Sequence, residues 1–417
     1  MEGRVVSAPA KIAEVAPRLP GSLCIAMAMQ LAAGGAVIPF VTLILRDRGL
    51  DFGQISQIFS ASSATLLLFP FVWGMLADRY VPLNRLFTVL NLLACGALAV
   101  FASQRTFAGL LVSFTLFVAC LNPTFSLINA LSFHHLPNPR EQFGFLRAWG
   151  SLGWIVPFLP ISLWMVYVKE TRLDFVLYIG MGLCLVMALV SFWLPHTPPG
   201  ARRKDGGAES RGSYLPAVKR LVRDPNYLVL LASMFLIAGS YSLLMYYSPP
   251  FLQDMGVPRI WIGPIQAIGV ISEIIFFQWQ PGLIRRWNYT TIILIGCVAL
   301  LLRQLIYSVA ESAWVLSLSY VLAGMVIVFY HMGVSVLVNA MAGPEVRATA
   351  QTLLVFFASG LGPMFANWTA GRLAAHFENS LRPVFLFAAA LAGLATLLIA
   401  VRGRQLNRTG HSEGEPA

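Results

Sequence analysis

The sequence predicts an all-α integral membrane protein with twelve transmembrane helices in two pseudo-symmetric six-helix bundles. Three observations predict this class: the composition, the spacing of the apolar segments and the distribution of basic residues. Of 417 residues, 57% are hydrophobic and 11% are charged, whereas a soluble domain carries about 25% charged residues. Most of the chain is therefore expected to lie in a lipid bilayer, and a soluble enzyme is excluded.

Twelve apolar segments follow one another along the chain. A helix of about 20 apolar residues crosses the hydrocarbon core of a bilayer, and each segment is long enough to do so. The predicted spans are residues 20–45, 54–77, 84–104, 107–132, 146–168, 174–195, 226–252, 261–284, 289–310, 313–339, 348–374 and 381–401.

A polar stretch separates the sixth span from the seventh. It is rich in Lys and Arg and contains the low-complexity sequence Asp205-Gly206-Gly207. We therefore expect an N-terminal bundle with a cytoplasmic tail over residues 1–195, a cytoplasmic linker over 196–225, and a C-terminal bundle with a cytoplasmic tail over 226–417.

The basic residues predict the orientation. Twenty of the 29 Lys and Arg lie in the tails, the linker and alternate loops, seven lie in the other loops, and Arg303 and Arg372 fall within spans. Because basic loops stay on the cytoplasmic side, both termini are expected to be cytoplasmic in a multi-pass protein of a bacterial inner membrane. The net charge of +11 is then explained by the basic residues of the cytoplasmic loops and tails, and no nucleic acid polymer is expected as a partner.

Short sequences recur about half a chain apart, as expected of two parallel halves related by an axis along the membrane normal. The recurring elements are Pro39-Phe40, Arg48-Gly49-Leu50 and Gly53 in the first half, and Pro250-Phe251, Met255-Gly256-Val257 and Gly263 in the second.

The loop expected after the second span reads Gly74-Met75-Leu76-Ala77-Asp78-Arg79-Tyr80, with Arg85 following. Glycine permits close helix approach, and an aspartate here can cap a neighbouring helix or pair with a basic residue across the half interface. The pattern resembles the signature loop of the major facilitator superfamily. That resemblance implies the major facilitator fold and a gating role for Gly74, Asp78, Arg79 and Arg85, with an ordinary charged turn as the alternative.

Ionisable side chains inside predicted spans are candidates for proton coupling, because an intramembrane charge is costly unless it is paired or hydrated. Glu273 lies near the middle of the eighth span and must face a cavity. Burial disfavours an ionised carboxyl group and a nearby cation favours it, so such a group can bind a proton in one conformation and release it in another. Arg303 is its expected ion-pair partner, and His331 is the third candidate because histidine titrates near neutral pH. Purely structural roles remain the alternatives.

Polar and aromatic side chains in the spans are candidates for substrate binding. Asn122 and Asn129 lie seven residues apart and share one helix face, and Pro123 between them frees a backbone carbonyl. Helix gluing is the alternative for both. The further candidates are Arg147, Ser151, Trp154, Tyr241 and Tyr330; for Arg147, snorkelling to the membrane edge is the alternative.

Five segments together resemble the nucleoside:proton symporter branch of the major facilitator superfamily. By this resemblance, Arg147, Ser151 and Glu273 match positions in that family's substrate and proton pathway. The matching segments are Ser126-Leu127-Ile128-Asn129-Ala130-Leu131-Ser132-Phe133, Arg147-Ala148-Trp149-Gly150-Ser151-Leu152-Gly153, Leu194-Pro195-His196-Thr197-Pro198, Ser272-Glu273 and Val346-Arg347-Ala348-Thr349-Ala350-Gln351.

Two positions depart from that branch. An acidic residue of its tenth helix is absent from Val328-Phe329-Tyr330-His331, and Val270 replaces a glutamine one turn before Glu273. The acid, base and histidine of the C-terminal half also resemble the pattern of lactose-permease and phenylpropionate-transporter relatives.

The expected function is proton-coupled uptake of a small polar organic solute by alternating access, with a nucleoside favoured. The alternatives are transport of a sugar or aromatic acid, efflux of amphipathic compounds, and a receptor that binds without translocating. An intramembrane enzyme is disfavoured because HExxH and GxSxG motifs are absent. We expect no cofactor or metal; the partners are a small-molecule substrate, protons and the bilayer, and the protein is expected to be a monomer.

Overall fold

The computed structural model describes residues 20–136, 139–168, 172–197, 211–342 and 346–411. These residues form helices without any strand. Among them, twelve helical segments are long and apolar enough to cross a membrane, from Gly21–Asp47 to Arg382–Asn407. The predicted all-α class and the number of spans are confirmed.

The N-terminal half is a bundle of six spans, some of them broken into two helices. The first span is α1 and α2, interrupted at residues 38–40, and the second is α3 and α4. Its helices are α1 (Gly21–Val37), α2 (Val41–Asp47), α3 (Phe52–Thr65), α4 (Phe69–Arg79), α5 (Leu83–Ser103), α6 (Phe107–His135), α7 (Pro139–Ile155), α8 (Phe158–Val168), α9 (Asp174–Val190) and η1 (Ser191–Trp193).

The C-terminal half repeats this plan after the helix α10, which lies within the predicted linker. Its tenth and eleventh spans contain π-helical segments, η4 and η5, a geometry that is frequent at functional sites. The helices are α10 (Arg211–Arg223), α11 (Pro225–Asp254), η3 (Arg259–Trp261), α12 (Ile262–Arg286), α13 (Tyr289–Val309), α14 (Ala313–Leu318), α15 (Val321–Met325), η4 (Val326–Met332), α16 (Gly333–Met341), α17 (Arg347–Val355), η5 (Phe356–Leu361), α18 (Gly362–His376) and α19 (Arg382–His411).

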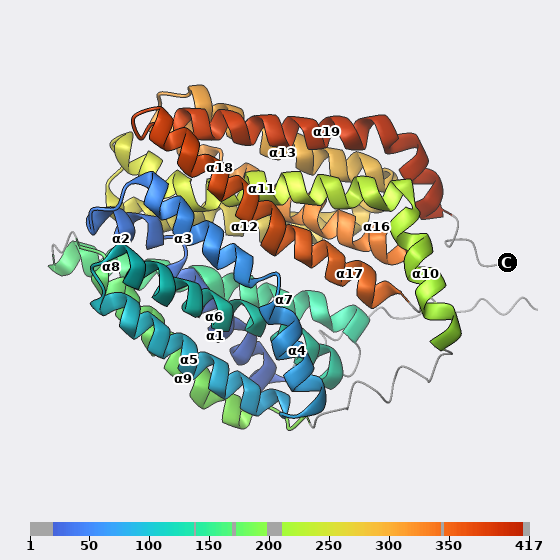
Figure 1. The fold of residues 1–417 in the computed structure, drawn as a ribbon, viewed down its shortest axis with the longest axis horizontal. Helices are drawn as coiled ribbons and strands as arrows, with labels where there is room; N and C mark the ends of the chain where they lie inside the picture. The colour runs from blue at the N-terminus through green and yellow to red at the C-terminus, as the bar shows by residue number, and fades with distance from the viewer. Residues whose placement is uncertain (1–19, 137–138, 169–171, 198–210, 343–345, 412–417) are drawn as a thin grey trace, which may run out of the picture.

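The two halves lie side by side in Figure 1, with α5 and α9 of the first half at the bottom and α13 and α19 of the second at the top. They pack through α3 against α18 and through α7 and α8 against α12. The helix α10 and the end of α19 lie at the right end of this view, and α2 lies at the left end. We call these the α10 end and the α2 end.

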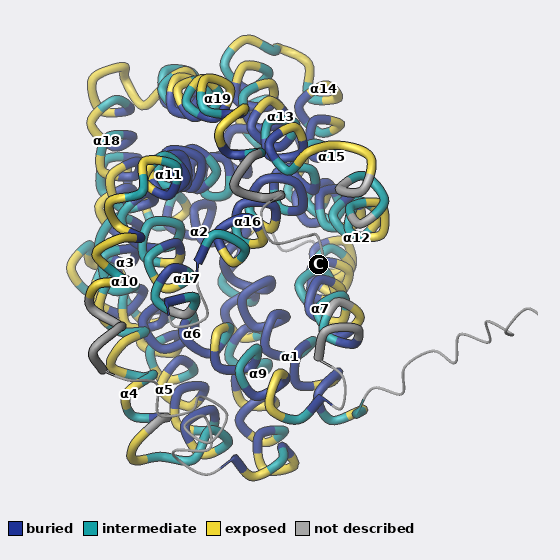
Figure 2. Tube along the Cα trace, turned by 90° about the vertical axis from the view of Figure 1, so that its right-hand side faces the viewer, coloured by how far each residue is buried: buried dark blue, intermediate teal, exposed yellow. Residues whose placement is uncertain are grey.

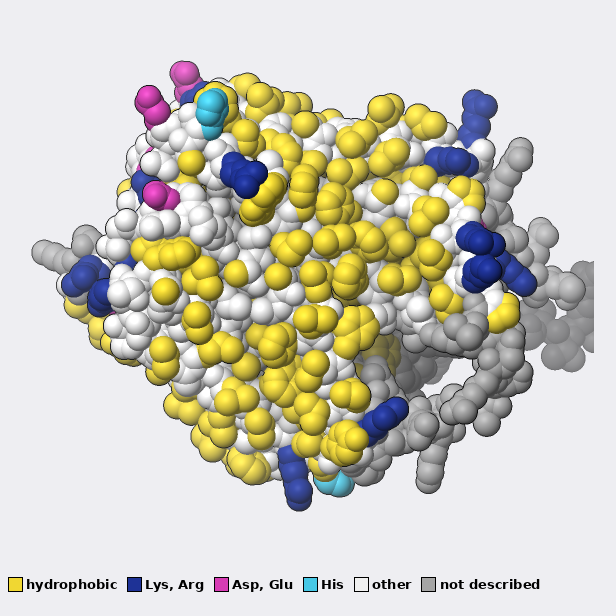
Figure 3. Space-filling view, viewed as in Figure 1, with side chains coloured by type: hydrophobic (Ala, Val, Ile, Leu, Met, Phe, Trp, Pro, Cys, Tyr) yellow, Lys and Arg dark blue, Asp and Glu magenta, His cyan; other side chains and the backbone are white. Residues whose placement is uncertain are grey.

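Burial separates central helices from peripheral ones. The apolar window of the first span is 94% buried and that of the seventh, α11, is 67% buried; Figure 2 shows α1 and α11 inside the molecule with exposed residues around the outside. On the face drawn in Figure 3, hydrophobic side chains cover the middle and most charged side chains lie toward the two ends. This is the distribution that a bilayer requires, because charges are costly in its hydrocarbon core.

The sequence echo between the halves corresponds to the same local structure. Gly49 and Gly256 both have a φ of 85°, a left-handed conformation that favours glycine. The amide after each glycine donates to a carbonyl five residues earlier, from Leu50 to Leu45 and from Val257 to Leu252, so the first span of each half ends in the same turn.

Candidate functional site

A cavity of about 250 Å³ lies between the two halves. The N-terminal half lines it mainly through α7, and the C-terminal half lines it through α11, α12, α13 and the α15 region. Three α7 side chains, Arg147, Ser151 and Trp154, reach it together because residues four and seven apart share a helix face. Gln266 and Glu273 of α12 have the same spacing of seven.

One hydrogen bond in the cavity joins the two halves. The Ser151 hydroxyl donates to Glu273 Oε1 over 3.1 Å, and the positive charge of Arg147 acts on the same carboxyl group. The α15 helix packs closely behind Glu273, since a Cβ atom at Gly324 would lie 2.3 Å from the Glu273 backbone nitrogen. The backbone at Glu273 is therefore packed against its own half, and its carboxyl group is contacted from the other.

Arg303 enters the cavity from α13 and forms no ion pair with an acid of the described residues. Its side chain lies over the Tyr320 ring, with the guanidinium carbon 4.1 Å from the ring centroid and 5.8 Å from that of Tyr307. Arg303 is 3% exposed, and its Nε and Nη2 atoms have no hydrogen-bond partner.

The predicted ion pair between Arg303 and Glu273 is wrong for this conformation. No ion pair among the described residues joins the two. The physical reason is that aromatic faces hold the guanidinium group, while the carboxylate is directed at Ser151 of the other half.

His331 lies behind the cavity wall, on the π-helical segment η4. Its ring packs edge-to-face on Tyr241, a cavity-lining residue, with centroids 5.9 Å apart. Its Nε2 atom is buried without a hydrogen-bond partner. The predicted histidine is thus one side chain away from the cavity.

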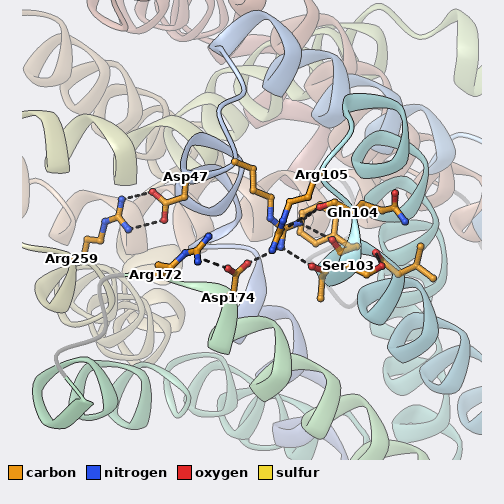
Figure 4. A network of polar contacts seen from close by, with 11 residues as sticks. Asp47, Ser103, Gln104, Arg105, Arg172, Asp174 and Arg259 are labelled. Carbon is orange, nitrogen blue, oxygen red and sulfur yellow. Dashed lines mark hydrogen bonds and ion pairs between the residues drawn. The ribbon is translucent and has the colours of Figure 1, made fainter.

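The halves also meet at the α2 end, where ion pairs close the molecule. Arg46 pairs with Asp254 at 2.8 Å, and Arg259 donates to both carboxylate oxygens of Asp47. Figure 4 shows the second pair beside Asp174, which accepts from Arg48 within the N-terminal half. We call the two pairs that join the halves, Arg46–Asp254 and Asp47–Arg259, the α2 seam.

The fold and the cavity can be set beside known proteins. The MFS_1 like family matches residues 22–387. The chain belongs to this family. YegT of Escherichia coli (strain K12) is 27% identical over 336 residues, covering 77% of this chain and 76% of that protein. The nucleoside permease NupG of the same organism is 23% identical over 353 residues, covering 80% and 81%.

A solved structure supports the same assignment of fold. A mutant of the nucleoside transporter NupG superposes with a TM-score of 0.80 at 20% identity, covering 91% of this chain and 98% of that chain. The predicted major facilitator fold is confirmed, and the chain is a multi-pass membrane transporter rather than an enzyme.

Three residues that were predicted to contact the substrate do not line the cavity. Tyr330 is fully buried, and its hydroxyl hydrogen-bonds Ser233 at 2.8 Å. Asn122 and Asn129 are half-buried on α6, outside the cavity wall. Their spacing shows that they share a face, but only packing decides which face of α6 meets a cavity.

The predicted gating motif is helical where a loop was expected. Gly74 and Arg79 lie in α4, which continues to Arg79, and the turn follows at Tyr80. Arg79 and Arg85 are exposed, and the side chain of Asp78 lies outside the described residues. The gating role of these four residues stays a prediction.

Sequence reasoning missed several residues of the cavity wall, among them Gln266 and Tyr320. Gln266 could have been found, because it lies two turns before Glu273 on the same helix face. Tyr320 carries no such signal: it supports Arg303 from the break between α14 and α15, and its hydroxyl hydrogen-bonds Ser248 at 2.8 Å.

Proposed function

We propose that this chain takes up a small polar organic solute, with a nucleoside favoured, together with protons by alternating access. The observation that carries this proposal is the contact of Ser151 with Glu273 in the cavity. This contact supports the proposal because an ionisable group lies where the two halves touch, in the wall of a cavity.

The coupling follows from what protonation does to this contact. Ionised Glu273 accepts a charge-assisted hydrogen bond from Ser151 and is attracted by Arg147. A proton on the carboxyl group removes its charge, so both interactions with α7 weaken. Proton binding therefore changes the free energy of contact between the halves, which is what a coupled transporter requires.

The movement is a rocking of residues 1–195 against residues 226–417, with the linker and both tails on the cytoplasmic side and a single chain as the working unit. In this conformation the α2 seam is closed. Opening the α2 seam would give the cavity access to that end of the molecule, as in alternating access by two related halves.

A nucleoside suits the chemistry of the wall. Trp154, Tyr241 and Tyr320 supply aromatic surface against which a base can stack, and Gln266 and Ser151 supply hydrogen-bonding groups for hydroxyls and ring nitrogens. The similarity to the nucleoside permease NupG supports the same cargo. Transport of an aromatic acid is the second candidate, favoured by the unpaired guanidinium group of Arg303.

The test is uptake of labelled uridine into proteoliposomes under an imposed pH gradient. Wild-type protein should accumulate uridine against its gradient, whereas Glu273→Gln should only equilibrate it because a glutamine side chain does not bind and release a proton as a carboxyl group does. Glu311→Gln is the matched control, since Glu311 is exposed between α13 and α14. Concentrative uptake by Glu273→Gln would contradict the coupling role of Glu273. Competition by sugars, or export of amphipathic dyes, would show that the cargo is a sugar or an amphipathic compound rather than a nucleoside.

A further inference from the structure

The cavity wall contains hydrogen-bond donors that the protein itself does not use. Among the described lining residues, four buried side-chain atoms lack a hydrogen-bond partner: Arg147 Nη1, Gln266 Nε2, Arg303 Nε and Arg303 Nη2. All four are N–H donors. A cargo with hydrogen-bond acceptor atoms could therefore satisfy the free donors of this wall.

The charges of the wall point the same way. The described side chains of the wall that can be charged near neutral pH are two arginines, Arg147 and Arg303, and one acid, Glu273. With Glu273 ionised, one positive charge is uncompensated, and with Glu273 protonated, both are. Because a buried unpaired charge is strongly unfavourable, an anion in the cavity is favoured in both protonation states.

Arg303 presents these donors in a defined geometry. The guanidinium group packs over the Tyr320 ring, and the free atoms Nε and Nη2 form one edge of it. Two parallel N–H groups on that edge match a planar pair of acceptors, as in a carboxylate. The rings of Trp154 and Tyr241 line the same cavity and provide apolar surface for an aromatic ring.

Resting on the transport function proposed above, we infer that the preferred cargo is a small aromatic monoanion whose planar acceptor pair is bound by the Nε and Nη2 edge of Arg303. Two kinds of compound share this chemistry. One is a nucleoside whose oxopurine base has lost a proton, and the other is an aromatic carboxylate.

Two matched ligand pairs test the inference by calorimetric titration of the purified full chain. Xanthosine is compared with inosine at a mildly alkaline pH, at which the first is ionised and the second neutral, and 3-phenylpropionate is compared with its neutral amide. In at least one pair the anion should bind about tenfold tighter or more, as expected of hydrogen bonds to a charged group. The pair that shows the preference identifies the kind of cargo.

Variants of Arg303 assign the preference to its side chain. Arg303→Gln should abolish the difference within the pair, and Arg303→Lys, which keeps the charge without the planar edge, should retain part of it. Arg382→Gln is the control, because Arg382 contacts the Ala310 carbonyl away from the cavity and should leave the preference unchanged.

Equal binding of anion and neutral analogue by the wild-type protein would overturn the inference whether or not the variants fold. A preference that survives Arg303→Gln would also overturn it. If uridine is still accumulated in either case, the proposed function stands and only the inference fails; if no nucleoside and no aromatic acid binds, both fail.

Discussion

The two halves touch in two different ways, at the cavity and at the α2 seam. In the cavity, the contact is a hydrogen bond between Ser151 and a buried carboxyl group. In the seam, both ion pairs are partly exposed, with side-chain exposures of 33% and 44% for Arg46 and Asp254. Water and salt screen exposed pairs, whereas polar contacts in a low-dielectric site are strong and costly to leave unmade. Transport should therefore depend strongly on the cavity contact and weakly on the seam.

The two places also differ in symmetry. Asp47 and Asp254 lie two residues before the equivalent glycines Gly49 and Gly256, and each accepts from an arginine of the opposite half. The cavity has no such balance, because its carboxyl group comes from one half only. A nearly symmetric seam can open by rocking alone, while the asymmetric cavity supplies the dependence on protons and cargo.

Among changes that leave Glu273 in place, the largest effect should come from Gly324→Ala, which acts on the support of the cavity contact. Its Cβ would lie 2.3 Å from both the Glu273 backbone nitrogen and the Ser272 hydroxyl, so α12 and α15 must separate, at a cost of about 1–3 kcal/mol for overpacking. Concentrative uptake should be almost lost and the melting temperature lowered. Gly182→Ala, with nothing within 4 Å of its Cβ, should change neither, and wild-type uptake by Gly324→Ala would contradict the packing argument.

A smaller effect is expected from Ser151→Ala, which removes only the hydrogen bond across the cavity. A hydrogen bond to a charged group contributes about 1.5–3 kcal/mol. Its loss destabilises only the conformation in which Ser151 contacts Glu273, so the protein should still fold while the initial uptake rate falls about tenfold. Uptake kinetics in proteoliposomes measure this. Ser126→Ala, at an exposed position of α6, is the control, and an unchanged rate in Ser151→Ala would mean that the halves are not coupled through this contact.

The smallest effect is expected from Asp47→Asn combined with Asp254→Asn, which neutralises the acids of the α2 seam. An exposed pair typically contributes about 0.5 kcal/mol, so removing both pairs should change uptake by less than about fivefold. Any dependence of the wild-type rate on ionic strength should become weaker in the double variant. Uptake at low and high salt, with both single variants, measures the effect, and a loss as large as that of Ser151→Ala would refute the contrast drawn here.

Much of the architecture could be predicted from the sequence because the bilayer imposes it locally. Each of the twelve spans must be apolar over about 20 residues, and that requirement can be read one segment at a time. The repeat was visible for a similar reason: the turn at Gly49 and Gly256 needs glycine at both places. Glu273 was identifiable because a carboxyl group is rare and costly in such a segment.

The partners of these residues could not be predicted in the same way. Arg303 was expected to pair with Glu273, yet it packs on Tyr320, a residue that the sequence does not distinguish from other aromatic residues of the spans. Asn122 and Asn129 were correctly placed on one helix, but the position of that helix relative to the cavity depends on its neighbours.

The sequence by itself thus determined the class, the number of spans, the repeat and the presence of a buried acid, because each depends on the free energy of single segments in lipid. Only the tertiary structure decided that Ser151 and Arg147 of one half face Glu273 of the other, and that Arg303 is left with free donors. Those features depend on contacts between helices that are far apart in the chain, and such contacts cannot be predicted from any local property of the sequence.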